Sequence, residues 1–460
     1  MAVVGLGREN VPLARYLMAR GARVTGFDRQ DPGDLPAPAR ALAALGVRLI
    51  GGPGYLEELA AGDFEAAFLT PGMAKDGPEI QALRDRGTLI TSQTNLFLQR
   101  CRAPVVGITG SSGKSTTTTL VGRILEADGR RPVYVGGNIG RVLIEQVDEI
   151  EPDARVVLEL SSFQLELVDR SPHIGVLLNL RPNHLDVHAS MAAYEAAKRR
   201  IFAYQRPEAG DVAVLGCDDP TVRAMVPAAP ARVSCFGLRE GVTHGATLRD
   251  GWVGLVDGDR WQPVLPAVEV ALPGTHNTLN VLAAVAAAAA CGAAPEAMRA
   301  GVAGFTGLEH RLQLVAEIDG RRFVNDSIAT APDRAAAALA AFSEPVVWIA
   351  GGYDKGVPFD ELAEVALQRP LRAVVLTGLT AQRIHQALEE AAGRLGLPLP
   401  PVHRAAGFDQ AVELAARLAQ PGDTILLSPA CASYDAFPNF AERGRRFAAL
   451  VQALAPTLES

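Results

Sequence analysis

The pattern of apolar and polar residues in the first hundred positions predicts alternating strands and helices. A short apolar run at 2–4 is followed by an amphipathic stretch at 11–20 and by a second apolar run at 23–27. Strands that alternate with helices in this way form parallel sheets. The N-terminal part of the chain is therefore predicted to be a Rossmann-like α/β domain.

The same alternation continues to the C-terminus, and two breaks in it divide the chain. A strand followed by a turn lies at 105–113, strand-like runs lie at 156–160, 174–179, 212–215, 346–350, 373–376 and 424–427, and a helical pattern covers 189–205. Breaks near 100–104 and 304–310 predict three α/β domains, with residues 1–102, 103–307 and 308–460. The Ala-rich run 281–294 is too short to span a membrane, so we expect a buried helix there.

Length and composition limit the kinds of protein that this chain can be. At 460 residues the chain exceeds the size of one hydrophobic core, so more than one domain is expected. Its net charge of −7 argues against nucleic-acid and anionic membrane partners. Five scattered cysteines without a Cys-x-x-Cys pair predict reduced thiols and no metal site. The N-terminus lacks the features of a signal peptide. We therefore expect a cytoplasmic protein.

A glycine-rich turn follows the first predicted strand. Gly5, Gly7 and Asn10 lie where a dinucleotide-binding turn carries three glycines, and Asp28 ends the next strand. Such a turn either binds a diphosphate or serves only as a structural turn. Because Asn10 replaces the third glycine, the sequence does not decide between these two roles. A nicotinamide-dependent dehydrogenase would explain this segment, although it would leave residues 110–116 unexplained.

A second glycine-rich loop lies between a predicted strand and a predicted helix. Its residues are Gly110, Ser111, Ser112, Gly113, Lys114, Ser115 and Thr116. Backbone N–H groups of such a loop bind phosphate, the lysine reaches the terminal phosphates, and the serine hydroxyl can bind Mg²⁺. The first glycine of the full Walker pattern would fall at Ile108, but the strand–loop–helix context predicts an ATP-binding site.

Further polar residues follow the strands of the central region. Glu159 ends an apolar run, where a carboxylate can hold Mg²⁺ or belong to a helix cap together with Ser161. His184 follows the next strand as an ambiguous metal ligand, and Lys198 reads by pattern alone as a solvated lysine. Asn280 lies at the start of the Ala-rich helix, where it either binds a nucleotide or caps the helix.

Together these motifs resemble the Mur ligases, the amide-forming enzymes of peptidoglycan precursor synthesis, over essentially the whole chain. The short Gly-x-x-Gly-Lys-Ser-Thr loop is that family's phosphate loop. The segments 136–140, 159–165 and 427–433 resemble the glutamate-adding members in particular, as do the residues that follow, Asp435, Phe437, Asn439 and Phe440.

The resemblance implies specific roles. Lys198 matches a lysine that the family carries as a carbamate, so Mg²⁺ would be held by Ser115, Glu159, His184 and carbamylated Lys198. ATP would be held by the phosphate loop with Asn280, Arg311 and Asp326. The UDP-sugar substrate would be held by Gly7, Arg8, Glu9, Asp28, Thr70, Pro71, Gly72, Asn138 and Ser161. The incoming amino acid would lie near Thr330, Lys355, Ser433 and Phe440.

The implied reaction joins glutamate to UDP-N-acetylmuramoyl-L-alanine through an acyl phosphate made from ATP. One departure from the family pattern is Ile328, which stands where a lysine is common, and Lys355 or Arg334 would then supply the charge. This departure leaves room for L-glutamate in place of D-glutamate.

Two alternative functions remain. One is another ligase of the superfamily, such as a folate polyglutamate synthase, and the other is a non-catalytic ATP-binding regulator.

Overall fold

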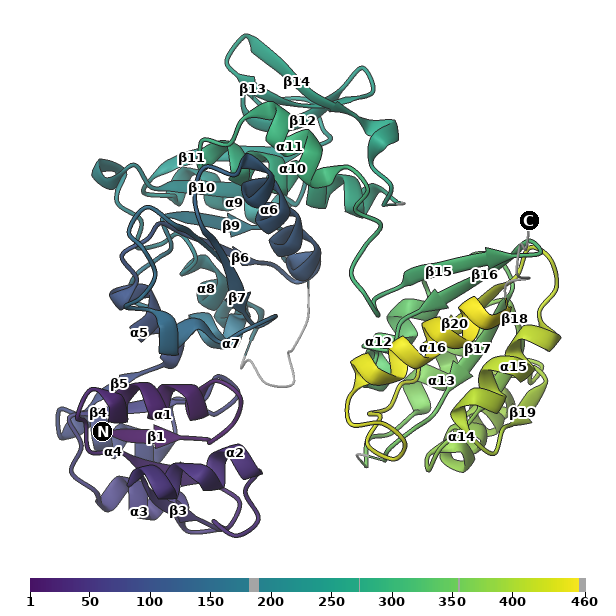
Figure 1. Cartoon of the computed structure of the whole chain (residues 1–460), viewed down its shortest axis with the longest axis horizontal. Coiled ribbons are helices and arrows are strands. Elements are labelled where there is room, and N and C mark those ends of the chain that lie inside the picture. Colours follow the sequence, from purple (N-terminus) through teal and green to yellow (C-terminus); the bar gives the residue numbers. More distant parts are fainter. Residues whose placement is uncertain (182–189, 273, 355, 455–460) are drawn as a thin grey trace. The chain divides into compact units, whose positions relative to one another are not determined.

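The computed structural model describes residues 1–181, 190–272, 274–354 and 356–454. It divides into two compact units, Met1–Phe305 and Thr306–Ser460 (Figure 1). The described residues form three sheets, two in the first unit and one in the second. The predicted α/β class is confirmed, with sheets that are parallel or mixed.

The first sheet contains five parallel strands, and helices cover both of its faces. Val3 packs with α1 on one face, while Ala2 and Val4 pack with α3 and α4 on the other, because side chains alternate along a strand. The strands in spatial order are β3 (Arg48–Gly51), β2 (Thr25–Asp28), β1 (Ala2–Val4), β4 (Ala66–Leu69) and β5 (Leu89–Thr91). The helices are α1 (Asn10–Ala19), α2 (Ala37–Arg40), α3 (Tyr55–Ala61), α4 (Pro78–Asp85) and α5 (Gln93–Arg100).

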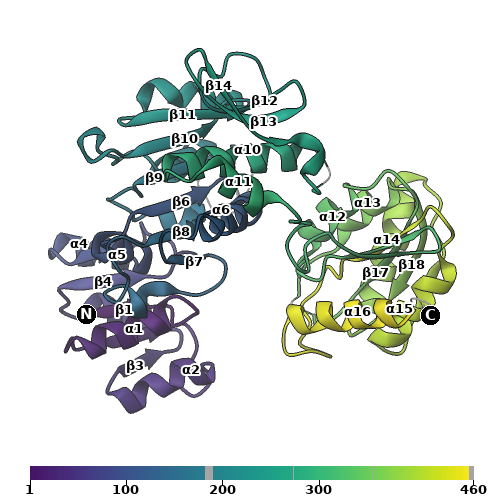
Figure 2. The ribbon, with the colours of Figure 1, turned by 45° about the horizontal axis from the view of Figure 1, so that its top comes forward.

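The second sheet has nine strands and is parallel except at one edge, where β12, β13 and β14 are antiparallel. Its strands in spatial order are β14 (Arg260–Pro266), β13 (Trp252–Asp257), β12 (His244–Arg249), β11 (Arg232–Gly237), β10 (Val212–Gly216), β9 (Ile174–Leu177), β6 (Val105–Thr109), β8 (Arg155–Glu159) and β7 (Val133–Gly137). The associated helices are α6 (Lys114–Asp128), α7 (Ser162–Leu165), α8 (Met191–Arg199), α9 (Pro220–Met225), α10 (Thr275–Ala290) and α11 (Pro295–Val302). Helix α10 packs on β9 to β13, and both α10 and α11 lie against α6 (Figure 2).

The first two sheets share one hydrophobic core. A single buried cluster contains Val3 and Leu13 from the first sheet and its helix, Phe97 from α5, and Val105 and Leu158 from the second sheet. Polar contacts reinforce this junction, since the Asp148 carboxylate accepts hydrogen bonds from the Tyr16 hydroxyl and from Arg20 and Arg100. The shared core explains why residues 1–305 form one compact unit.

The third sheet has six strands between two helical layers. Val346, Trp348 and Ala350 of β17 face one layer, and Val347 and Ile349 face the other. The strands in spatial order are β15 (Gln313–Ile318), β16 (Arg321–Asn325), β20 (Thr424–Leu427), β17 (Val346–Ala350), β18 (Leu371–Leu376) and β19 (Val402–Arg404). The first layer contains α12 (Pro332–Leu339), α13 (Asp360–Leu367) and α14 (Ala381–Leu395), and the second contains α15 (Phe408–Leu418) and α16 (Phe440–Leu454).

Several predicted elements have shifted ends. The Ala-rich helix begins at Thr275 and ends at Ala290, and its buried residues confirm a core helix. The helix predicted over 189–205 is α8, which ends at Arg199, where the backbone hydrogen bonds change to those of turns, such as the Ile201 N–H to the Lys198 carbonyl. Further along, the Gln205 amide donates to the Pro172, His173 and Val212 carbonyls. Across the described part of the chain, no helix combines the length and apolarity that crossing a membrane requires.

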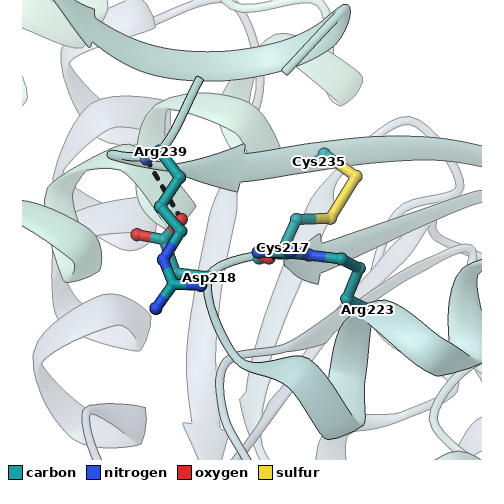
Figure 3. The surroundings of a disulfide bond; sticks show 5 residues. All are labelled: Cys217, Asp218, Arg223, Cys235 and Arg239. Carbon is teal, nitrogen blue, oxygen red and sulfur yellow. Dashed lines mark hydrogen bonds between the residues drawn. A yellow bond between two sulfur atoms is a disulfide. The ribbon is translucent and has the colours of Figure 1, made fainter. Parts of the chain in front are cut away.

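One disulfide bond departs from the expectation of reduced thiols. Cys217 follows β10 and is bonded to Cys235 on β11 (Figure 3). The two strands are parallel neighbours, and the Cα atoms lie 5.7 Å apart, within the range that a disulfide spans. The prediction of five reduced cysteines is therefore wrong for this pair, whose proximity depends on strand register and not on sequence spacing.

Candidate active site

The predicted phosphate loop connects β6 to α6 and ends in a glycine with left-handed backbone conformation. Gly113 has φ +82, and a Cβ atom there would lie 2.2 Å from Asn280 Oδ1, so any other residue would be strained and would displace the Asn280 side chain. The Lys114 ammonium donates to the carbonyls of Gly110 (2.9 Å) and Ser111 (3.3 Å). The loop therefore holds its lysine above the start of α6, where helix N–H groups and the helix dipole favour an anion.

The structure brings Asn280 to this loop from a distant part of the sequence. Asn280 lies in the first turns of α10 and is buried, and its amide nitrogen donates to Asn277 Oδ1 at 3.2 Å. Thr117 in α6 donates to Asn280 Oδ1 at 3.5 Å. The packing of α10 against α6 thus places this predicted ATP-binding residue beside Gly113.

Two residues that the sequence analysis did not select support the loop. Asn179, just after β9, accepts a hydrogen bond from the Ser112 backbone at 2.9 Å and returns one to the Ser112 carbonyl. The Tyr194 hydroxyl lies 3.0 Å from Ser111 Oγ. Tyr194 and Lys198 are four residues apart on α8 and so share a face of that helix, a spacing that indicates a common environment.

Lys198 is buried beside the phosphate loop and is not the solvated lysine that its local pattern indicates. Its side chain is 1% exposed, and its ammonium lies 3.2 Å from Thr109 Oγ1 and 3.0 Å from the Gly110 carbonyl. Burial lowers the pKa of Lys198 to about 6, with a smaller lowering from the charge of Lys114 and an opposing effect of Glu159. At neutral pH this amine is therefore mostly uncharged and nucleophilic.

Glu159 is a buried carboxylate at the end of β8. Its Oε1 atom accepts a hydrogen bond from Asn138 Nδ2 at 2.9 Å, whereas Oε2 has no hydrogen-bond partner among the described residues. A buried, unsatisfied carboxylate oxygen is costly unless a cation or donor compensates it. The Glu159 carboxylate and the Ser115 hydroxyl of the loop are oxygen donors of the kind that a hard divalent cation takes.

Two other predictions about this region have different outcomes. Ser161 caps the short helix α7, since its Oγ accepts the Gln164 N–H while Gln164 Oε1 accepts the Ser161 N–H. This confirms the capping alternative for Ser161, while Glu159 does not act as a cap. His184 lies outside the described residues. No cluster of three metal-ligating His, Cys, Asp or Glu side chains occurs in the ranges that the structure describes.

The N-terminal turn joins the first sheet to the second. Arg8 donates to the carbonyls of Asn138 (3.0 Å) and Gly140 (2.5 Å), and the Glu9 carboxylate accepts from Gln164 Nε2 at 2.7 Å. Burial raises the pKa of Glu9, and the Gln164 hydrogen bond partly opposes the rise. The predicted UDP-sugar residues of the turn therefore lie against the loop that carries Asn138.

The remaining residues predicted to bind UDP lie around Gly5. Gly5 has φ +80, and a Cβ atom there would lie 2.6 Å from the Thr70 methyl group, so Thr70, the first residue of the Thr70–Gly72 turn, packs against Gly5. The Asp28 carboxylate accepts the Leu6 N–H at 2.8 Å and so holds the turn itself. Asn10, which replaces the third glycine, is buried and donates to the Val4 carbonyl.

In the second unit, predicted site residues gather where β16 and β20 end. Asp326 follows β16 and accepts hydrogen bonds from Ser428 Oγ (2.9 Å) and from the Leu312 N–H (3.2 Å). Burial raises the pKa of Asp326 to about 6, and its hydrogen bonds and the charges of Arg311 and Arg334 partly offset that rise. The positive charges of Arg311 and Arg334 thus lower the pKa of this carboxylate, although burial keeps it above its usual value.

The residues predicted around the amino acid come from two neighbouring loops and from the start of α16. Thr330 lies in the loop after β16, and its N–H donates to the Ile328 carbonyl. Ser433 lies in the loop after β20 and is buried. The Phe440 carbonyl accepts from Ser327 Oγ at 2.8 Å. Lys355 lies outside the described residues, so the residue that compensates for Ile328 stays a prediction.

Comparison with known proteins points to one family. Residues 108–288 match the Mur ligase middle domain, and residues 310–431 match the Mur ligase glutamate ligase domain. A UDP-N-acetylmuramoylalanine--D-glutamate ligase from Symbiobacterium thermophilum is 52% identical over 455 residues and covers 98% of both chains. One from Clostridium novyi is 41% identical over 454 residues, covering 99% of this chain and 96% of the relative.

Solved structures agree in fold. A UDP-N-acetylmuramate-alanine ligase from Thermotoga maritima aligns with a TM-score of 0.56 at 20% identity, covering 98% of this chain and 99% of the other. At that identity the similarity concerns the fold alone.

Proposed function

Since this chain belongs to the Mur ligase family, we propose that it joins D-glutamate to UDP-N-acetylmuramoyl-L-alanine during peptidoglycan precursor synthesis. As a Mur ligase it is an ATP-dependent, ADP-forming amide ligase. The observation that carries the proposal is the convergence of Lys114, Lys198 and Glu159 on one phosphate loop, in a chain 52% identical to a D-glutamate ligase.

The phosphate loop performs the first step of the proposed reaction. A carboxylate resists attack by an amine because oxide would have to leave. Transfer of the ATP γ-phosphate to the terminal alanine carboxylate gives an acyl phosphate, from which phosphate leaves readily when the glutamate amine attacks. Charge builds on the phosphoryl group during transfer, and Lys114 and the loop N–H groups stabilise it.

We propose that Ser115, Glu159 and a carbamylated Lys198 hold Mg²⁺, with His184 as a further ligand outside the described residues. A neutral lysine amine adds CO₂ to form a carbamate, and burial keeps Lys198 in this neutral form. When bound, the cation would offset the phosphate charge. The unsatisfied Oε2 of Glu159 supports this site.

We further propose a three-domain division of the chain. Residues 1–102 would bind the UDP moiety through the Gly5–Glu9 turn, Asp28 and the Thr70–Gly72 turn. Residues 103–307 would bind ATP, and residues 308–460 would bind glutamate near Thr330, Lys355, Ser433 and Phe440. Arg311 and Asp326 would contact ATP, and Asn138 and Ser161 the muramoyl-alanine portion. The enzyme would act as a cytoplasmic monomer.

The proposal is tested with the Lys114→Ala variant. We expect at least a hundredfold loss of glutamate-dependent ADP release, because the variant lacks the cation that neutralises the transferring phosphate. The assay supplies UDP-N-acetylmuramoyl-L-alanine, ATP and either D- or L-glutamate, and circular dichroism checks the fold. More than a tenth of wild-type turnover in the variant, or no ADP release by the wild type with either isomer, contradicts the proposal.

A further inference from the structure

A buried arginine occupies the first turn of α16, among the residues proposed to surround glutamate. The Arg443 side chain is 3% exposed. Its Nε donates to Ser327 Oγ (3.0 Å), Nη1 to the Ala432 carbonyl (3.2 Å), and Nη2 to the carbonyls of Ser327 and Cys431 (both 3.0 Å). One guanidinium therefore bonds to the loop after β16 and to the loop after β20.

The charge of Arg443 is not neutralised by direct contact with a carboxylate. All four of its hydrogen bonds go to hydroxyl or carbonyl oxygens, and no ion pair involves it in the described ranges. The start of a helix disfavours a cation, and burial lowers the pKa of Arg443 to about 10 despite the opposing effects of Cys431 and Asp435. The side chain is thus still charged at neutral pH.

The loop that Arg443 holds is strained. Ala430 has φ +59, a left-handed conformation that costs a non-glycine residue about 1 kcal/mol or more. The Pro429 carbonyl accepts the Gly351 N–H, and the Cys431 carbonyl accepts from Arg443, so both sides of Ala430 are held. A strained backbone maintained in this way keeps Ser433 in a defined place relative to the loop of Thr330.

We propose that Arg443 is a positioning and specificity residue for the amino-acid substrate, one that ties the loop of Thr330 to the loop of Ser433 and favours an amino acid with an acidic side chain. This inference rests on the proposed function. The hydrogen bonds set the distance between the two loops. The guanidinium forms no ion pair in the described ranges, although Asp435 acts on it electrostatically, and its charge attracts the additional carboxylate that distinguishes glutamate from glutamine.

Two substitutions separate these roles. Arg443→Gln removes the charge and most of the hydrogen bonds, so the KM for glutamate should rise about tenfold, equivalent to about 1.4 kcal/mol, and the preference for glutamate over glutamine should fall. Arg443→Lys keeps a cation but cannot reach four acceptors, so the KM for glutamate should rise while the preference is retained. The KM for the UDP-sugar should stay within about twofold, because its proposed contacts lie in the other unit.

The matched control is Arg446→Gln on the same helix. Arg446 is exposed and pairs with Asp409, so its loss should leave both KM values within about twofold. A folded Arg443→Gln variant with wild-type KM and wild-type preference overturns the inference. If that variant does not fold, an unchanged glutamate KM in Arg443→Lys overturns it instead. Absence of glutamate-dependent ADP release in the wild type removes the proposed function as well, so the two failures are distinguishable.

Discussion

The two units bury basic side chains at comparable places, close to where parallel strands end, yet the side chains differ in charge. Lys198, beside the phosphate loop, loses its proton readily because burial lowers its pKa to about 6. Arg443, beside the loops after β16 and β20, keeps its proton with a pKa of about 10. A buried lysine can become a neutral nucleophile, whereas a buried arginine remains a fixed cation that organises carbonyl groups. The comparison indicates that the surroundings of Lys198 suit covalent chemistry on the lysine amine, whereas the surroundings of Arg443 suit recognition of a substrate.

The strongest test of this contrast gives the first unit the side chain of the second, by replacing Lys198 with arginine. Lys198→Arg should lower the turnover of ADP release by about a hundredfold, because a guanidinium stays protonated and forms no carbamate. In wild-type enzyme supplied with ¹³C-bicarbonate, NMR should show a carbamate signal that the variant lacks. Lys198→Ala should be similarly inactive but partly restored by acetate or formate. Turnover above a third of wild type in Lys198→Arg contradicts the role given to the lysine.

A second test concerns the buried carboxylate of the second unit. The pKa of Asp326 is about 6 in the folded protein and near 3.8 when unfolded, so the folded state binds the proton more tightly. The free energy of unfolding contributed by this group should therefore fall as pH rises from about 4 to about 6, by about 2 kcal/mol. Hydrogen exchange of the β20 amides across this range should show the fall in wild type and less of it in Asp326→Asn. Identical pH profiles would mean that Asp326 titrates normally.

The smallest effect is expected for alanine substitutions at two glycines. Their comparison separates the cost of backbone strain from the cost of a steric clash at the phosphate loop. Gly113 and Gly210 have similar φ values of +82 and +75, but only at Gly113 would a Cβ atom meet another side chain, that of Asn280. Gly210→Ala should cost about 1 kcal/mol of stability through strain alone. Gly113→Ala should cost more and should raise the KM for ATP. Equal losses of stability and an unchanged KM would show that the contact with Asn280 is unimportant.

Local sequence patterns predicted much of the fold but not every neighbour. The strands Ala2–Val4 and Thr424–Leu427 match their predicted ranges, because continuous apolar runs are typical of strands covered on both faces. The pairing of Cys217 with Cys235 was missed, since it depends on the register of two strands. Helix α8 is shorter than its pattern indicates, because the backbone after Arg199 forms turns, as the Ile201 N–H to Lys198 carbonyl bond shows.

The candidate site shows the same division between local and tertiary information. The phosphate loop was recognisable because its chemistry lies within seven consecutive residues. Lys198 looks solvated from its neighbours in sequence, and only the packing of α8 against β6 reveals its burial. Arg443 gave no local signal, because its four acceptors come from segments that meet only in the folded unit.

The core shared by the first two sheets bears on how the protein can be dissected. A fragment starting at residue 103 would bare the apolar surface that Val3, Leu13 and their neighbours cover, and such a surface promotes aggregation. Expression of the nucleotide-binding half for crystallography or inhibitor screening should therefore retain the N-terminal hundred residues and stop near Phe305.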